Sequence, residues 1–127
     1  MTPIIAVDFD GTIVTHAYPQ LGADIGAIPW LAQARTKGAR LLLLTMRHGE
    51  TLAAAVDYCN ARGLEFWAVN ENPEQRTWTE SAKVYAHLYI DDSGLGMPLS
   101  RKLRERPHVD WPAAGPLLNR WLERWPG

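Results

Sequence analysis

The sequence predicts an α/β fold in which a central parallel sheet carries helices on both faces. Two observations lead to this class. Short apolar runs alternate with segments whose apolar residues recur at helical spacing, and these segments end at glycines, as in Lys37-Gly38 and Arg62-Gly63. Strands that alternate with helices in this way pair in parallel through right-handed crossovers. We therefore predict a Rossmann-like three-layer α/β/α sandwich.

Five elements are predicted in the first half of the chain. Residues 3–9 and 40–45 are apolar runs that end in polar residues, which is typical of buried parallel strands. Apolar residues keep a helical period over residues 25–37 and 49–61, so each of these segments is predicted as a helix. Residues 64–69 then form a third strand.

The second half of the chain is less regular. Residues 70–79 are polar and contain Asn72-Pro73, so we expect a loop there, followed by a helical turn near 80–84. Residues 87–90 form a fourth strand. The remaining expectations are a basic amphipathic helix over 98–106, an edge strand over 108–111 and a closing helix over 113–125.

Composition narrows the class of protein. The chain has 127 residues, which suits one domain over residues 1–127, and its 13 basic and 14 acidic side chains nearly cancel. No broad positive field exists to attract nucleic acid or an anionic membrane. The single cysteine, Cys59, excludes an internal disulfide framework, and neither a signal peptide nor a long apolar segment is apparent. We expect a cytoplasmic protein.

Polar side chains follow three of the four predicted strands. Asp8 and Asp10 end the first strand, Thr45 ends the second, and Asp91-Asp92 ends the fourth. The carboxyl ends of parallel strands meet at one edge of a sheet, which is where ligands bind in such folds. Several carboxylates at one place repel each other unless a cation neutralises them, and oxygen ligands favour Mg²⁺. The sequence therefore predicts a magnesium site at this edge.

The run Asp8-Phe9-Asp10-Gly11-Thr12 has the composition of a phosphoryl-binding turn. In an extended backbone the two aspartates point the same way, while Phe9 points to the opposite side. Gly11 permits a tight turn that brings backbone N–H groups near an anion, and the Thr12 hydroxyl can tie that turn together. A phosphoryl group is the expected ligand.

Four stretches resemble, in order, the motifs of the haloacid dehalogenase superfamily. They are Val7 to Thr12, Leu41 to Thr45, the lone Lys83, and Leu88 to Asp92. The resemblance implies that Asp8 attacks phosphorus and forms an aspartyl-phosphate, while Asp10 acts as general acid and then general base. It also implies a set of residues that bind the phosphoryl group, which comprises Gly11, Thr12, Thr45, Met46, Lys83 and Arg47.

The same resemblance implies the metal ligands. Mg²⁺ would bind the Asp8 carboxylate, the backbone carbonyl of Asp10, and Asp91. Asp92 would be a second ligand through water or would position Lys83. An acid at the position of Asp10 also favours phosphate-ester hydrolysis or phosphotransfer over the ion-pumping and dehalogenating branches of the superfamily.

Two features depart from many members of that superfamily. Lys83 lies only eight positions before Asp91, and Arg47 is its rival as the phosphate-neutralising cation. The connections are also too short for a cap domain. Capless relatives act on large substrates or use a neighbouring subunit as a lid, so the expected partners are a phosphorylated small molecule or macromolecule and a second copy of the chain. His16 and His48 are weaker candidates for substrate contact.

Two other functions stay open. A phospho-accepting receiver-like signalling domain has a similar length and similar residue types, but it carries adjacent acids after its first strand, whereas here the adjacent acids follow the fourth. A noncatalytic binding module on the same fold is the other alternative. The interpretation that accounts for all the motifs is a magnesium-dependent phosphomonoester hydrolase.

Overall fold

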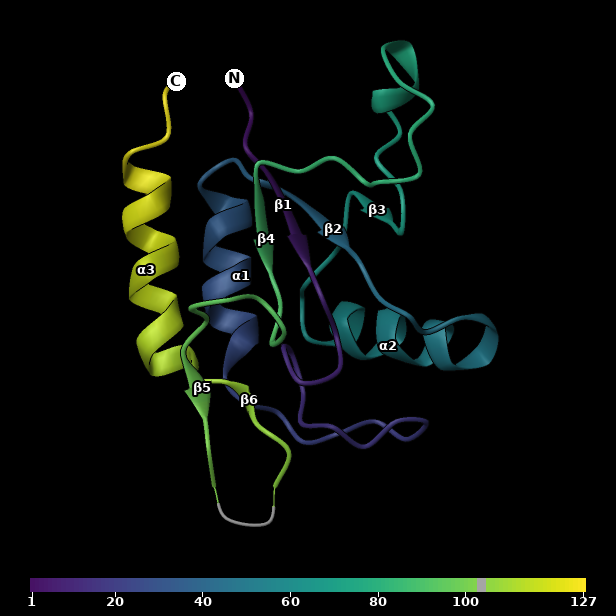
Figure 1. Ribbon diagram of the computed structural model, residues 1–127, viewed down its shortest axis with the longest axis vertical. Coiled ribbons are helices and arrows are strands. Elements are labelled where there is room, and N and C mark those ends of the chain that lie inside the picture. The colour runs from purple at the N-terminus through teal and green to yellow at the C-terminus, as the bar shows by residue number, and fades with distance from the viewer. Residues whose placement is uncertain (103–104) are drawn as a thin grey trace.

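The computed structural model describes residues 1–102 and 105–127 and contains a four-stranded parallel sheet (Figure 1). The strand order is β3-β2-β1-β4, and every neighbouring pair is parallel. The α/β class with a parallel sheet is confirmed. The strands are β1 (Ile4–Val7), β2 (Arg40–Leu43), β3 (Ala68–Val69) and β4 (Leu88–Ile90). The predicted third strand, 64–69, is therefore shortened to its last two residues.

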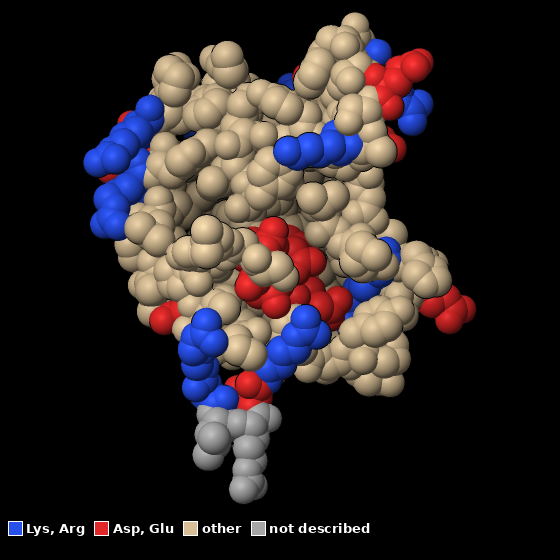
Figure 2. Space-filling model, in the orientation of Figure 1, with Lys and Arg blue, Asp and Glu red and all other residues tan. Residues whose placement is uncertain are grey.

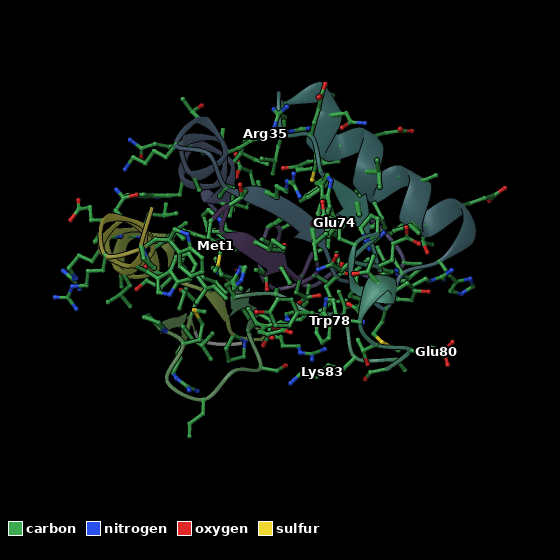
Figure 3. All side chains as sticks on the ribbon, turned by 90° about the horizontal axis from the view of Figure 1, so that it is seen from above. Met1, Arg35, Glu74, Trp78, Glu80 and Lys83 are labelled. Carbon is green, nitrogen blue, oxygen red and sulfur yellow. The ribbon has the colours of Figure 1, made fainter. Side chains whose placement is uncertain are left out.

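All three helices contribute to the core on one face of the sheet. Ile5 and Val7 of β1 belong to the same buried cluster as Leu31, Cys59 and Leu118, which come from the three helices in turn. Figure 3 shows the helices gathered on this side of the sheet when the molecule is seen from above. The helices are α1 (Ala27–Thr36), α2 (Gly49–Ala61) and α3 (Trp111–Glu123), so the prediction for 49–61 is confirmed at both ends.

The opposite face of the sheet is covered by an irregular segment, and the prediction of helices on both faces is wrong. Ile4, Ala6 and Leu42 pack there against Val84 and Ala86, which belong to the connection between β3 and β4. This connection returns past β1 to the far edge of the sheet, so a right-handed crossover carries it over the face that α1 and α2 leave free.

The connection between β3 and β4 contains only one short 3₁₀-helix, η1 (Gln75–Thr77), and no helix at 80–84. The buried Gln75 side chain replaces helical hydrogen bonds. Its Nε2 donates to the carbonyls of Ser81 (3.2 Å) and Lys83 (2.9 Å), and its Oε1 accepts from the N–H of Tyr85 (2.8 Å). One polar side chain thus organises the stretch that a helical turn was expected to occupy.

A helix was predicted at 98–106, but the described residues 98–102 and 105–106 form none, and a two-stranded antiparallel pair occurs in this region. Strands β5 (Leu99–Ser100) and β6 (His108–Val109) pair with each other, so the predicted strand at 108–111 exists but is not an edge of the main sheet. Residues 103 and 104 of the predicted helix lie outside the described residues. The Val109 N–H donates to the Gly11 carbonyl (2.8 Å), so a contact distant in sequence holds the hairpin beside the turn after β1.

The closing helix, α3, begins two residues earlier than predicted because Pro112 suits a first helical turn. It packs closely on α1, since a Cβ at Gly115 would lie 2.2 Å from Trp30 Cε2. Cys59 is fully buried, as expected of a small core residue, and burial raises its thiol pKa to about 12. Among the described residues, no helix has the length and apolar character needed to cross a membrane.

Candidate active site

An open cleft of about 660 Å³ lies at the carboxyl edge of the sheet. Seven of the predicted site residues are among those that line it. Figure 2 shows acidic side chains gathered in one patch on this face of the molecule, with Lys and Arg side chains beside it. The seven are Asp8, Asp10, Thr45, Met46, Arg47, Asp91 and Asp92. Residues more than 80 positions apart in sequence therefore share one cleft, as the parallel topology requires.

Asp8 is a carboxyl group of the cleft that has no Lys or Arg partner among the described residues. It directly follows β1, where its N–H donates to the Ile90 carbonyl of β4 (3.0 Å), and its side chain is half-buried. Burial raises the Asp8 pKa from 3.8 to about 7; the Phe9 N–H opposes this rise and the nearby Asp92 carboxylate adds to it. Asp8 is therefore only partly ionised at neutral pH when no metal is bound.

Gly11 and Thr12 shape the turn after β1 and do not line the cleft. The Gly11 N–H donates to the Val14 carbonyl (2.7 Å), so it is not free to bind a phosphoryl oxygen as predicted. Gly11 has a φ of 78°, and a Cβ there would lie 2.1 Å from His16 Nε2. Thr12 is fully buried, and its hydroxyl donates to Asp8 Oδ2 (3.2 Å). Thr12 therefore orients Asp8 and does not contact the cleft itself.

Arg47 pairs with Asp10, which corrects its prediction as a phosphate-binding cation. Its Nε and Nη2 donate to the two carboxylate oxygens of Asp10, each at 2.8 Å. The same guanidinium donates to the carbonyls of Gln20 (2.7 Å) and Thr51 (3.2 Å), and the side chain is only 2% exposed. Its cationic head lies 4.9 Å from the centre of the Phe9 ring. Every direction in which it could donate is occupied by the protein.

Thr45 and Met46 lie in the loop that follows β2. The Thr45 N–H donates to the side-chain carbonyl of Asn70 (2.8 Å), and the Thr45 hydroxyl accepts from the Arg47 N–H (3.1 Å). Asn70 itself has a φ of 54°, a conformation that asparagine tolerates better than most residues. The Thr45 hydroxyl keeps a proton to donate into the cleft. Met46 is 95% exposed, so its side chain forms part of the rim.

Asp91 and Asp92 follow β4, where each carboxylate already has one protein partner. Asp91 Oδ1 accepts from the Ser93 N–H (2.8 Å). Asp92 Oδ2 lies 2.7 Å from His16 Nε2, and both side chains are mostly buried. His16, a weaker candidate from the sequence, therefore lies in the cleft and contacts one of its acids. His48 also lines the cleft.

Lys83, like Gly11 and Thr12, is a predicted site residue that does not line the cleft. It is exposed, and its ammonium lies 5.8 Å from the centre of the Tyr89 ring. Figure 3 shows it near Trp78, on the side of the sheet away from the helices. Lys83 precedes β4, whereas the cleft lies beyond the carboxyl end of that strand. Asp92 contacts His16 instead of positioning Lys83.

Within residues 1–102 and 105–127, no three His, Cys, Asp or Glu side chains are close enough together to form a metal site. Two of the cleft carboxylates are turned elsewhere, Asp10 toward Arg47 and Asp92 toward His16. The donor atoms nevertheless fit a hard cation. The carboxylates of Asp8, Asp91 and Asp92 line one cleft, and carboxylate oxygens are the ligands that hard cations prefer; the raised Asp8 pKa comes mainly from burial, with a smaller contribution from the Asp92 carboxylate.

Three residues that sequence reasoning did not select also belong to the site. Tyr18 and Arg106 line the cleft, and both are exposed. The indole N–H of the buried Trp111 donates to the Thr12 carbonyl (2.7 Å), which fixes the turn that carries Asp8. No local pattern marks these residues, because each reaches the site through a long-range contact. The sequence offered one indication: the indole N–H of a buried tryptophan needs a hydrogen-bond acceptor, and Trp111 is such a residue.

Comparison with known proteins identifies a relative without naming an activity. No protein-family model matches the sequence, and no curated protein matches it. A solved structure that does match is a conserved protein from Bacteroides thetaiotaomicron, which is 38% identical with a TM-score of 0.76. The match covers 95% of this chain and 93% of the Bacteroides chain. With this identity over nearly the whole of both chains, the protein belongs to the same family as that conserved Bacteroides protein.

Proposed function

We propose that the protein is a magnesium-dependent phosphomonoester hydrolase of the haloacid dehalogenase type, with Asp8 as its nucleophile. The observation that carries the proposal is the state of Asp8. It is a half-buried carboxyl group in an open cleft, its pKa is about 7, and within the described residues no Lys or Arg is paired with it. A carboxylate kept without a counter-charge suits a site that is completed by a cation and a substrate.

The local hydrogen bonds indicate which oxygen of Asp8 attacks. Thr12 donates to Oδ2, so we propose Oδ1 as the oxygen that attacks phosphorus. The ester oxygen then departs and an aspartyl-phosphate forms on Asp8; water subsequently attacks phosphorus and releases the carboxylate. The Thr45 hydroxyl is suited to donate a hydrogen bond to the phosphoryl oxygens during both steps.

Mg²⁺ would be held by the carboxylates of Asp8 and Asp91 and by the Asp10 carbonyl, with Asp92 nearby. When bound, such an ion neutralises the charge between an attacking carboxylate and a phosphoryl oxygen. The protein's own contribution is to hold these oxygens at one edge of the sheet. Asp8 does this through β1, and Asp91 does it through the adjacent β4.

Asp10 is proposed as the group that protonates the departing oxygen and then accepts a proton from water. Both of its oxygens accept hydrogen bonds from Arg47. One of these bonds must open before Asp10 can carry a proton. This requirement gives specific support to a second candidate function, a phospho-accepting domain in which Asp8 is phosphorylated but hydrolysis is slow.

The test is hydrolysis of an aryl phosphate in the presence of Mg²⁺. We expect turnover that EDTA abolishes and that Asp8→Asn reduces to the uncatalysed background. Asp57→Asn, an exposed aspartate on α2 away from the cleft, is the matched control and should keep the wild-type rate. Turnover that persists in Asp8→Asn would reject Asp8 as the nucleophile.

The same assay separates the two candidate functions. A hydrolase releases many equivalents of phosphate for each protein molecule. A phospho-accepting domain stops near one equivalent and retains acid-stable, base-labile phosphate on the protein. Asp10→Asn should lower hydrolase turnover by about 100- to 10,000-fold. An unchanged rate would remove Asp10 from the proposed chemistry.

A further inference from the structure

Arg106 is a basic residue of the cleft that no motif accounts for. It lies just before β6, is exposed, and lines the cleft together with the acids of the proposed site. Two contacts fix the base of its hairpin. Val109 donates to the Gly11 carbonyl (2.8 Å), and Asp110 donates to the Pro98 carbonyl (2.9 Å). The hairpin is therefore hydrogen-bonded to the turn that carries Asp8, and this contact holds the backbone near Arg106 beside that turn.

Neither of the two cations expected from the sequence is available to bind a phosphoryl group in this cleft. Arg47 is buried and its donors are used by Asp10 and by backbone carbonyls. Lys83 lies against Tyr89, outside the lining of the cleft. Among the lining residues that the structure describes, Arg106 is the Lys or Arg side chain without an ion-pair partner.

The charges of the cleft show why a further cation is needed. Four carboxylates line it, and Arg47 compensates one of them, which leaves three. A divalent cation would reduce this to one net negative charge, and a phosphoryl group adds roughly 1.5 to 2 more near neutral pH. The occupied site would thus carry an excess of negative charge in a partly buried cleft. An arginine that can donate two parallel hydrogen bonds to phosphoryl oxygens compensates part of it.

We propose that Arg106 binds the phosphoryl oxygens of the substrate and takes the place that sequence motifs assign to Lys83. The inference rests on the proposed function for the identity of the substrate. It does not depend on turnover, because phosphate binding can be measured by itself. Among the described residues of the β5–β6 hairpin, Arg106 lines the cleft, so the hairpin then supplies a substrate-binding cation.

The experiment compares the binding of inorganic phosphate to Mg²⁺-loaded wild-type protein, Arg106→Ala, Arg106→Lys and Arg101→Ala by titration calorimetry. Arg101 is the matched control, since it is an exposed arginine near the start of the same hairpin that does not line the cleft. We expect Arg106→Ala to weaken binding by about 10- to 100-fold, which corresponds to the loss of charge-assisted hydrogen bonds. The phosphate affinity of Arg106→Lys should lie between those of wild type and Arg106→Ala, and that of Arg101→Ala should equal the wild-type affinity.

Two results would overturn the inference: a phosphate affinity of Arg106→Ala within twofold of the Arg101→Ala value, or no phosphate binding by the wild-type protein. A failure of the proposed function gives a different result, namely no turnover, or turnover that survives Asp8→Asn, whatever the phosphate affinities are. Because Arg106 is exposed, we expect all variants to unfold at the wild-type temperature. If Arg106→Ala unfolds at a lower temperature than wild type, Arg106→Lys, which retains the charge, provides a second comparison.

Discussion

The two aspartates after β1, Asp8 and Asp10, are separated by one residue and lie in opposite electrostatic environments. Asp10 is paired at both oxygens with a buried arginine. Asp8 accepts hydrogen bonds from the Thr12 hydroxyl and the Phe9 N–H, and burial, with a contribution from the neighbouring Asp92 carboxylate, raises its pKa to about 7. The fold therefore compensates one acid and leaves the other without a cation. We propose that this difference lets the Asp10–Arg47 pair stabilise the fold in the metal-free protein and leaves Asp8 as the reactive carboxylate.

The largest change in the free energy of unfolding should come from removing Arg47, the cation that compensates the charge of Asp10. Arg47→Met leaves the Asp10 carboxylate without its partner and removes the donor to the Gln20 and Thr51 carbonyls. Breaking a buried pair in this way typically costs about 3 to 5 kcal/mol of unfolding free energy. Urea unfolding measures the loss. Arg47→Met combined with Asp10→Asn should recover part of it, whereas a loss below about 1 kcal/mol would show that the pair is not structural.

Asp8 should show the opposite behaviour, because removing its charge stabilises the metal-free protein. The folded pKa of about 7 lies above the ordinary 3.8, so the folded state keeps a proton that the unfolded chain releases between these values. The free energy of unfolding should therefore fall as the pH rises from about 4 to about 7 and change little from this group above that range. Asp8→Asn should gain about 2 kcal/mol near pH 8 in EDTA, after allowance for the partial exposure of the group.

Denaturant unfolding of wild type and Asp8→Asn across this pH range is the measurement. Their stabilities should converge as the pH falls below about 4, where Asp8 becomes protonated in both the folded and the unfolded wild-type protein. Asp57→Asn is again the control and should show no such pH-dependent gain. A destabilised Asp8→Asn at pH 8 would mean that the Asp8 charge is compensated in the folded state.

A smaller effect is expected from the contact that holds the turn itself. Trp111→Phe removes the indole donor to the Thr12 carbonyl and should cost about 1 kcal/mol. Trp125→Phe is a matched control, because the Trp125 indole donates to the exposed Met1 carbonyl, which water can satisfy. Thermal unfolding should separate the two variants. Equal losses would show that the Thr12 contact has no special role.

The sequence predicted the elements of the first half of the chain and the sheet edge where the candidate site lies. It predicted the second half of the chain and the contacts within the site less well. Helical periodicity placed α2 at its observed ends, and the carboxyl ends of the parallel strands brought Asp8, Thr45 and Asp91 to one cleft, because local pattern and sheet geometry determine these features. The segment after β3 was harder. There, the side chain of Gln75 satisfies backbone groups that a helix would otherwise pair.

The roles of the basic residues could not be predicted for a related reason. Arg47 is buried by acceptors from three separate parts of the chain, and Arg106 reaches the cleft because β6 bonds to the Gly11 carbonyl. Such contacts join residues that no local pattern connects. Charge and position along the chain thus identified basic residues as candidates, and only the tertiary structure separated the paired cation from the exposed one.

The most direct test of the central claim is chemical trapping of Asp8. Wild-type protein is mixed with Mg²⁺ and an aryl phosphate, quenched, and treated with borohydride, which reduces an acyl phosphate on aspartate to homoserine. Peptide mass spectrometry then locates the change. We predict homoserine at position 8 in the sample with substrate and unmodified Asp8 in the sample without it. Homoserine at Asp10, Asp91 or Asp92 instead, from a protein that turns over, would contradict the assignment of Asp8 as the nucleophile.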